Sequence, residues 1–192
     1  MPSPTAMQAT ELRNFRRIHP RIGVGGIAAE LARNPLAWAL STRRQTRCVE
    51  QRETESIVLR RGQPEHPEQA VEDAHLVVDG PGMPYFPLTL AWLRATAGVL
   101  GGELARALFA RLPPGAQVYR HIDRGDYYAC RDRFHLVIES RGGSPMVCGR
   151  ERVVMQEGEL WRFDNKRPHE ASNPSDSPRV HLIFDLLMKE RA

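Results

Sequence analysis

The C-terminal half of the chain contains short β-like runs of apolar and branched residues. After Pro113-Pro114-Gly115 these runs occupy residues 117–122, 133–139, 144–148, 152–155, 159–163 and 179–187. Turn clusters rich in glycine and proline separate them, and the residues between 172 and 178 include two prolines. Many short strands at close spacing predict an all-β sandwich or barrel.

The N-terminal half has a different pattern. Apolar positions between residues 25 and 40 predict one or two helical turns, interrupted at Asn34-Pro35. Residues 88–97 (LTLAWLRATA) form the strongest predicted helix, which ends among nearby glycines. Residues 56–60 (SIVLR) predict a strand, and residues 62–73 read as a surface loop.

These patterns predict a mainly β protein with helices, of the α+β class. We expect residues 1–12 to form a flexible tail and residues 13–192 to form one domain. Within it, a helical or mixed part extends to about residue 103 and packs on a β-barrel core over residues 104–188.

Composition narrows the class of protein. The 192 residues are 41% hydrophobic and 26% charged, which is typical of a globular chain. No apolar stretch reaches the length of a membrane-spanning helix, and the N-terminus lacks the apolar run of a secretory signal. We therefore expect a cytoplasmic protein with no membrane partner. Three cysteines without a CxxC pair argue against a disulfide framework and a cysteine-based zinc site.

Positive charge is concentrated in the N-terminal third. The net charge is +4, but residues 1–64 hold eleven arginines against five acids. Because the arginine side chain suits carboxylate and phosphate groups, this region could contact an acidic partner. A genome that favours arginine codons would explain the excess equally well.

Candidate metal chemistry begins at His121-Ile122-Asp123. Residues i and i+2 of a strand share a face and lie roughly 6.6 Å apart, so both side chains can reach one ion. An imidazole and a carboxylate are two of the three ligands in the facial triad that holds non-haem Fe(II). His169, about four predicted strands later, is the candidate third ligand.

Arg179 opens the otherwise apolar run that ends the chain. Burying an arginine is costly unless an anion meets it. A bound carboxylate, accepted in bidentate fashion, would supply that anion.

Taken together, His-x-Asp, His and an Arg ten residues later follow the order of the Fe(II)/2-oxoglutarate oxygenases. More narrowly, residues 115–185 resemble the aspartyl/asparaginyl β-hydroxylase family. The matching residues are His121, Arg133-Phe134-His135-Leu136, Gly158, Phe163-Asp164-Asn165, His169-Glu170, Arg179 and Ile183-Phe184-Asp185.

The resemblance implies a double-stranded β-helix, a cupin-like jelly-roll barrel, with Fe(II) at its open mouth. It implies that His121 and His169 bind iron, joined by Asp123 as in bacterial amino-acid hydroxylases. It also implies that Arg179 binds the distal carboxylate of 2-oxoglutarate, with Arg133 and His135 helping to hold this cosubstrate. A serine that contacts the cosubstrate in some members falls near Ala110 here, so that contact is expected to be missing.

The implied activity is hydroxylation of an amino acid, free or within a peptide or protein, with O2 consumed and succinate and CO2 released. Aspartyl or asparaginyl β-hydroxylation is the family default. An acidic substrate would suit the arginine-rich N-terminal part. Candidate substrate contacts are Arg43, Arg44, Arg60 and Asn165.

Two alternatives remain open from the sequence. The spacing around His121 and the later His169-x3-Asn173 also resemble cupin motifs, which would suit a metal-dependent isomerase or dioxygenase without a keto acid. A non-enzymatic nucleic-acid binder is the other alternative, although no known binding motif is present. Its phosphate contacts would be Arg13, Arg16, Arg17, Arg21, Arg43, Arg44 and Arg47.

Overall fold

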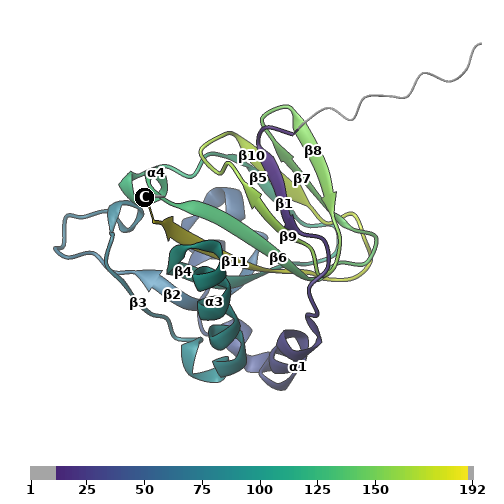
Figure 1. The fold of residues 1–192 in the computed structure, drawn as a ribbon, viewed down its shortest axis with the longest axis horizontal. Helices are drawn as coiled ribbons and strands as arrows, with labels where there is room; N and C mark the ends of the chain where they lie inside the picture. The colour runs from purple at the N-terminus through teal and green to yellow at the C-terminus, as the bar shows by residue number, and fades with distance from the viewer. Residues whose placement is uncertain (1–11, 190–192) are drawn as a thin grey trace, which may run out of the picture.

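Two antiparallel sheets dominate the computed structural model, which describes residues 12–189 (Figure 1). The larger sheet has seven strands in the order β1-β9-β6-β11-β4-β2-β3, and the smaller has four in the order β5-β10-β7-β8. The strands are β1 (Phe15–His19), β2 (Glu55–Gly62), β3 (Val77–Asp79), β4 (Gly102–Leu112), β5 (Gln117–His121), β6 (Asp132–Glu139), β7 (Ser144–Cys148), β8 (Glu151–Met155), β9 (Leu160–Phe163), β10 (His169–Ser172) and β11 (Arg179–Met188). The predicted mainly β, α+β class is confirmed.

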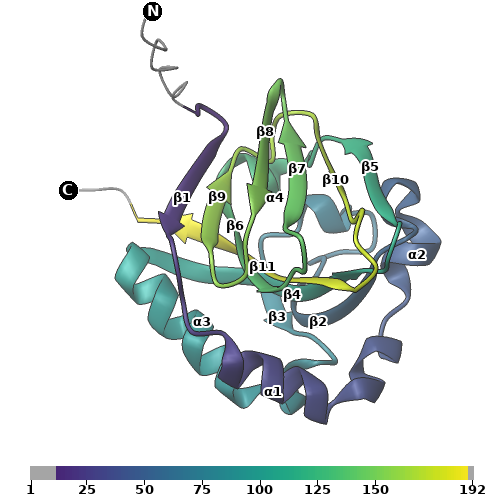
Figure 2. The same cartoon turned by 90° about the vertical axis from the view of Figure 1, so that its right-hand side faces the viewer.

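Helices α1 and α3 cover the outer face of the larger sheet (Figure 2). The α-helices are α1 (Gly25–Arg33), α2 (Arg43–Arg47), α3 (Pro87–Leu100) and α4 (Asp126–Ala129), and 3-10 turns occupy Pro35–Ala39, Val49–Gln51, Val71–Asp73 and Met83–Tyr85. The break predicted at Asn34-Pro35 separates α1 from the first 3-10 turn. None of the described helices is long and apolar enough to span a membrane.

The strongest predicted helix, α3, forms because its ends and its inner face are both satisfied. Pro87 occupies its first turn, and Gly101 ends it in the left-handed conformation that glycine adopts readily. The buried carboxylate of Glu30 in α1 accepts hydrogen bonds from the backbone N–H groups of Leu88 and Thr89. This negative charge caps the positive end of α3 and joins the two helices.

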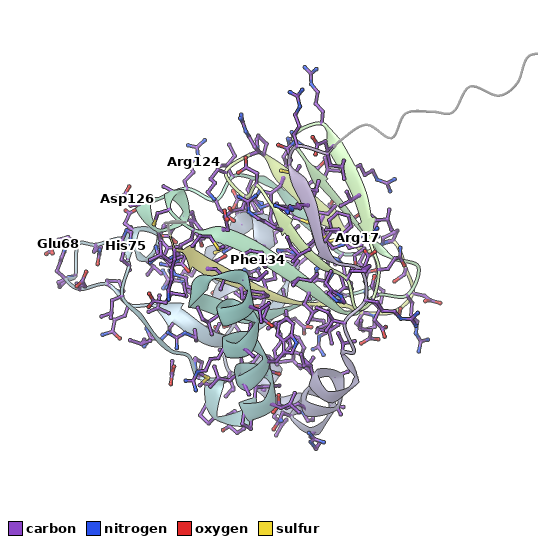
Figure 3. The ribbon with its side chains drawn as sticks, in the orientation of Figure 1. Arg17, Glu68, His75, Arg124, Asp126 and Phe134 are labelled. Carbon is purple, nitrogen blue, oxygen red and sulfur yellow. The ribbon has the colours of Figure 1, made fainter. Side chains whose placement is uncertain are left out.

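The larger sheet is buried on both faces, which explains its long apolar strands. On β6, Phe134 faces the helices and stacks on Phe184 of β11, against which Trp92 of α3 packs edge-on (Figure 3). The alternate residues of β6 and β11 face the smaller sheet. This inner face, unlike the face toward the helices, carries buried polar side chains. They are Arg133, His135, Arg179, His181 and Asp185.

Strands β1, β3 and β4 of the described region were not predicted. Residues 102–112 (GELARALFARL) are rich in residues that favour helices, yet they form β4, which pairs with both β11 and β2. β1 pairs with β9 at the edge of the sheet. The N-terminal part therefore supplies strands to the larger sheet as well as helices that pack on it. The expected tail, residues 1–12, lies outside the described residues except for Leu12.

Candidate metal centre and adjoining cavities

Strand register brings two distant histidines together. His121 ends β5 and His169 begins β10, and the two residues are directly paired in the smaller sheet. Directly opposed residues of an antiparallel pair point to the same face. As a result the imidazole rings lie with their centroids 4.3 Å apart, although 48 positions separate them in sequence.

Asp123 completes a three-residue cluster at this point. β5 ends before Asp123, so the aspartate lies in the segment that follows the strand and not on the strand as the sequence suggests. Its backbone N–H donates to Asn165 O at 3.1 Å, which draws the segment toward the histidines. One ligand atom each from His121, Asp123 and His169 lies within 4.8 Å of the others. The arrangement fits a single ion held by two imidazoles and one carboxylate.

Backbone hydrogen bonds set the orientation of both imidazoles. Nδ1 of His121 lies 2.7 Å from Tyr119 O, and Nδ1 of His169 lies 2.9 Å from Arg167 O. A carbonyl oxygen only accepts, so each Nδ1 carries a proton and Nε2 is the ring atom left to bind a metal. Burial lowers the pKa of His169 to about 4 despite the nearby Asp123, so this ring is neutral at neutral pH. Both Nε2 atoms face the carboxylate of Asp123, at 3.6 Å and 3.9 Å.

Two side chains donate hydrogen bonds to the carboxylate of Asp123. Its Oδ2 accepts from Arg133 Nη1 at 2.6 Å and from Asn165 Nδ2 at 3.0 Å. Burial is the largest single influence and opposes ionisation, but Arg133, the two histidines and the hydrogen bond from Asn165 together outweigh it, so the pKa of Asp123 is lowered. The carboxylate is therefore ionised, and Oδ1 remains directed at His121.

Arg133 is itself locked in place. Its Nε and Nη2 donate to the two carboxylate oxygens of Asp185 at 2.8 Å and 2.9 Å, while its Nη1 donates to Asp123. Asp185 also accepts from the hydroxyl of buried Tyr127 at 3.1 Å. One buried guanidinium thus neutralises part of the charge of two buried carboxylates, and its geometry fixes where Asp123 points.

An inner cavity connects the histidines with Arg179. Its wall includes His121, His135, His169 and Arg179, and also Leu112 of β4. Arg179 is 6% exposed and forms no ion pair with any described residue. Its Nη2 lies 3.5 Å from His181 Nδ1, and its Nε has no partner. Burial lowers the pKa of Arg179 to about 10, so the side chain remains a cation at neutral pH.

Two buried histidines, His181 and His135, follow Arg179 in a chain of polar contacts. His135 Nδ1 lies 3.2 Å from His181 Nδ1, and His181 Nε2 lies 3.0 Å from the hydroxyl of Ser144. Burial, reinforced by Arg179, holds the pKa of both imidazoles well below the usual value. Both rings are therefore neutral, and the positive charge at this end of the cavity belongs to Arg179 alone.

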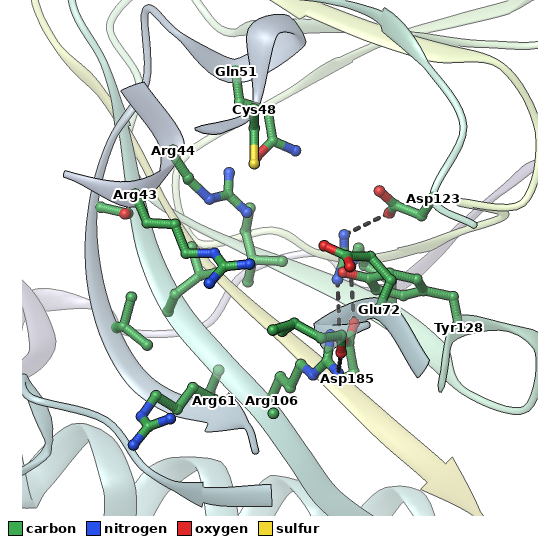
Figure 4. A pocket seen from close by; sticks show the side chains of 18 of the residues that line it. Arg43, Arg44, Cys48, Gln51, Arg61, Glu72, Arg106, Asp123, Tyr128 and Asp185 are labelled. Carbon is green, nitrogen blue, oxygen red and sulfur yellow. Dashed lines mark hydrogen bonds and ion pairs between the residues drawn. The ribbon is translucent and has the colours of Figure 1, made fainter. Parts of the chain in front are cut away.

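A larger outer cavity of about 340 Å³ opens in front of Asp123 (Figure 4). Arg43 and Arg44 of α2 direct their guanidinium groups into it, opposite Asp123 and Tyr128. Neither arginine forms an ion pair or hydrogen bond with a side chain of the described region. Arg44 lines the inner cavity as well, so it stands where the two cavities meet.

The remaining residues singled out in the sequence fall in three places. Arg60 lines the outer cavity but donates to Ala105 O and pairs with Asp79. Asn165 lines neither cavity, and its amide supports Asp123. Arg133 lines both cavities, but its donors bind Asp123 and Asp185.

Sequence reasoning missed two residues beside the centre. Gln51 Nε2 lies 3.4 Å from His121 Nε2, and Thr54 lies in the wall of the inner cavity. Both belong to the segment between α2 and β2, which carries no motif that would mark it. The pairing of β2 with β4 and the hydrogen bonds between Glu53 and β5 bring this segment over the cavity.

Comparisons with known proteins agree with this geometry. The sequence model of the family described as aspartyl/asparaginyl beta-hydroxylase matches residues 80–189, more than half of the chain. A comparison with curated protein sequences found no significant match.

Two solved structures share the fold over nearly the whole chain. A prolyl-4-hydroxylase from Pseudomonas putida is 21% identical, with a TM-score of 0.54, over 92% of this chain and 93% of that one. An oxidoreductase of the 2OG-Fe(II) oxygenase family from Burkholderia pseudomallei is 14% identical, with a TM-score of 0.51, over 89% of this chain and 93% of that one. The predicted jelly-roll architecture is confirmed.

Proposed function

The chain belongs to the aspartyl/asparaginyl β-hydroxylase family and is an oxygenase-type hydroxylase, and from this premise we propose that it uses Fe(II) and 2-oxoglutarate to hydroxylate an amino acid or an amino-acid residue. The observation that carries the proposal is the cluster of His121, Asp123 and His169, with its ligand atoms within 4.8 Å of one another. Two imidazoles and one carboxylate suit Fe(II) and leave coordination positions for other ligands. Iron bound with 2-oxoglutarate and O2 would replace a C–H hydrogen of the substrate by hydroxyl, releasing succinate and CO2.

Residues of the chain prepare this centre before any ligand arrives. The carbonyl oxygens of Tyr119 and Arg167 hold the two imidazoles with Nε2 facing inward. Arg133 and Asn165 occupy Oδ2 of Asp123, which leaves Oδ1 for the metal. Such supporting contacts tune metal affinity by orienting the ligands. We therefore assign Arg133 a positioning role, in place of the cosubstrate contact that the family resemblance implies.

The inner cavity suits a dicarboxylate cosubstrate. Arg179 is a buried cation without a carboxylate partner in the described region, and a carboxylate bound there would supply the missing charge. The same cavity is lined by His121 and His169. A 2-oxoglutarate molecule placed along it would have its distal carboxylate at Arg179 and its keto-acid end at the metal, beside His135.

The outer cavity supports an acidic substrate. Arg43 and Arg44 present unpaired positive charge opposite Asp123, and Arg60 adds to the positive potential of the wall. An aspartyl side chain, or an amino-acid carboxylate, would be attracted there. Replacing Arg43 by Ala is expected to raise the Michaelis constant for substrate, whereas Arg47→Ala, on the same helix but outside the cavity, should leave it unchanged. An unchanged constant for both variants would contradict the assignment.

The decisive experiment loads the protein with Fe(II) and 2-oxoglutarate under nitrogen and then admits O2. Amino acids and cell-extract peptides are screened by mass spectrometry for the gain of one oxygen atom, coupled to an equal amount of succinate. A product that forms without 2-oxoglutarate would favour the cupin-type alternative. If the protein shows no turnover but binds nucleic acid with an affinity that decreases as salt is added, the result would favour the non-enzymatic nucleic-acid binder.

A further inference from the structure

We propose that Thr54 is a specificity-determining residue for the cosubstrate, whose hydroxyl donates a hydrogen bond to the distal carboxylate of 2-oxoglutarate beside Arg179. The inference rests on the proposed function, because it concerns the ligand of the inner cavity. It adds a residue outside the region matched by the family model, which begins at residue 80.

Strand register puts Thr54 and Arg179 on the same wall. Thr54 directly precedes β2, whose first residue Glu55 pairs with Arg111 of β4, so Thr54 lies next to Leu112, the residue that follows Arg111. Arg179 of β11 pairs with Leu112 from the other side. Opposed residues of an antiparallel sheet share a face, so Thr54 and Arg179 flank Leu112 and point inward together. All three residues line the inner cavity.

Both flanking side chains carry donors without a partner. Thr54 is 2% exposed and its Oγ1 forms no hydrogen bond, and Nε of Arg179 likewise has none. Burying such groups without partners costs free energy, so a matching acceptor is expected. A carboxylate provides two acceptor oxygens and the negative charge that Arg179 lacks.

No other hydroxyl from residues 12–189 lines the inner cavity. Strand β4 contributes Ala110 and Leu112 to the wall, and neither side chain has a polar atom. The hydroxyl on this wall therefore comes from Thr54, the residue directly before β2.

The backbone around Thr54 is held on both sides. The carboxylate of Glu53 accepts from Gln117 N–H at 2.9 Å and from the hydroxyl of Tyr119, both on β5. On the other side, Glu55 forms an ion pair with Arg111 of β4. The N–H of Thr54 itself donates to Gln51 O at 2.9 Å. A backbone fixed in this way places the Thr54 side chain at the cavity wall before the ligand binds, which favours affinity.

The test compares two keto acids on the metal-loaded protein under nitrogen, with Mn(II) in place of Fe(II). Dissociation constants are measured by calorimetry for 2-oxoglutarate and for 2-oxobutyrate, which has no distal carboxylate. Thr54→Val removes the hydroxyl at nearly constant volume, and Thr54→Ser retains it. Ser56→Ala is the matched control, because Ser56, two residues further on in β2, is also a buried hydroxyl without a hydrogen bond but lines the outer cavity.

We expect Thr54→Val to weaken 2-oxoglutarate binding about tenfold or more, the usual effect of losing a hydrogen bond to a charged group. Thr54→Ser and Ser56→Ala should bind it as the wild type does, and 2-oxobutyrate binding should be the same in all four proteins. Wild-type affinity in Thr54→Val, or an equal loss for both keto acids, would overturn the inference about Thr54 alone. Failure of the wild-type protein to bind 2-oxoglutarate at all would overturn the proposed function as well.

Discussion

Replacing Arg179 by Met should stabilise the ligand-free protein while removing its affinity for 2-oxoglutarate. Burial lowers the pKa of Arg179 from the usual high value of a guanidinium to about 10, with no other group contributing to the shift. Because each pKa unit corresponds to about 1.4 kcal/mol, holding this charge in the folded state costs about 3 kcal/mol. Methionine fills a similar volume without the charge, so the free energy of unfolding should rise by an amount of that order.

The effect on the ligand has the opposite sign. Without Arg179 the distal carboxylate of 2-oxoglutarate would enter the cavity unpaired. Breaking such a buried pair costs about 3–5 kcal/mol, which corresponds to two to three orders of magnitude in affinity. A residue that lowers stability in order to bind a ligand is a common feature of functional sites.

Urea denaturation of the metal-free protein measures the first effect. The change in melting temperature on adding 2-oxoglutarate, with Mn(II) under nitrogen, measures the second. Arg152→Met on β8 is the matched control, since its side chain is exposed and its loss should change the free energy of unfolding by less than about 0.5 kcal/mol. Destabilisation of the ligand-free protein by Arg179→Met would refute the reasoning, because it would mean that a partner compensates the charge.

Three further outcomes follow from the metal centre and the buried histidines. His169→Ala should abolish Mn(II) binding in a metal titration, whereas His66→Ala, an exposed histidine, should bind like the wild type. Arg133→Met leaves two buried carboxylates unpaired, so urea denaturation should show a loss of about 3–5 kcal/mol, and metal affinity should fall by roughly 10–100-fold; unchanged affinity in the folded variant would remove its positioning role. The pKa values of His135 and His181 are lower in the folded state than in the unfolded chain. Below about pH 6.5 the unfolded chain therefore binds more protons, and the free energy of unfolding decreases as the pH is lowered. His181→Asn should make that fall shallower by up to about 1.4 kcal/mol per pH unit in urea titrations between about pH 6 and 5, and an equal slope would show that His181 is not buried in its neutral form.

The site contains two buried arginines, of which one has its charge compensated by carboxylates and the other does not. Arg133 has two carboxylate partners, and Arg179 has none in the described region. Both side chains face the space between the two sheets, from neighbouring strands β6 and β11. The compensated cation can only hold its neighbours in place, whereas the uncompensated one can attract a ligand.

Sequence by itself determined the elements whose formation is local. The C-terminal strands follow turn clusters around residues 141–143 and 157–158, where glycine allows the backbone to reverse. The helix α3 follows from its apolar spacing, its initial Pro87 and its final Gly101. The residue types His121, Asp123, His169 and Arg179 also suffice to suggest a metal and an anion, because their chemistry does not depend on the fold.

Tertiary structure decided which of these groups meet and which are already occupied. Residues 102–112 favour a helix locally but become a central strand, because pairing on both sides and burial outweigh intrinsic propensity. Strand register sets His121 opposite His169, and the pairing of β2 and β11 with β4 brings Thr54 and Arg179 to either side of Leu112. Arg133 looks like a ligand-binding residue in the sequence, yet two carboxylates distant in sequence already bind its donors. Such pairings depend on contacts between segments far apart in the chain, and no local pattern encodes them.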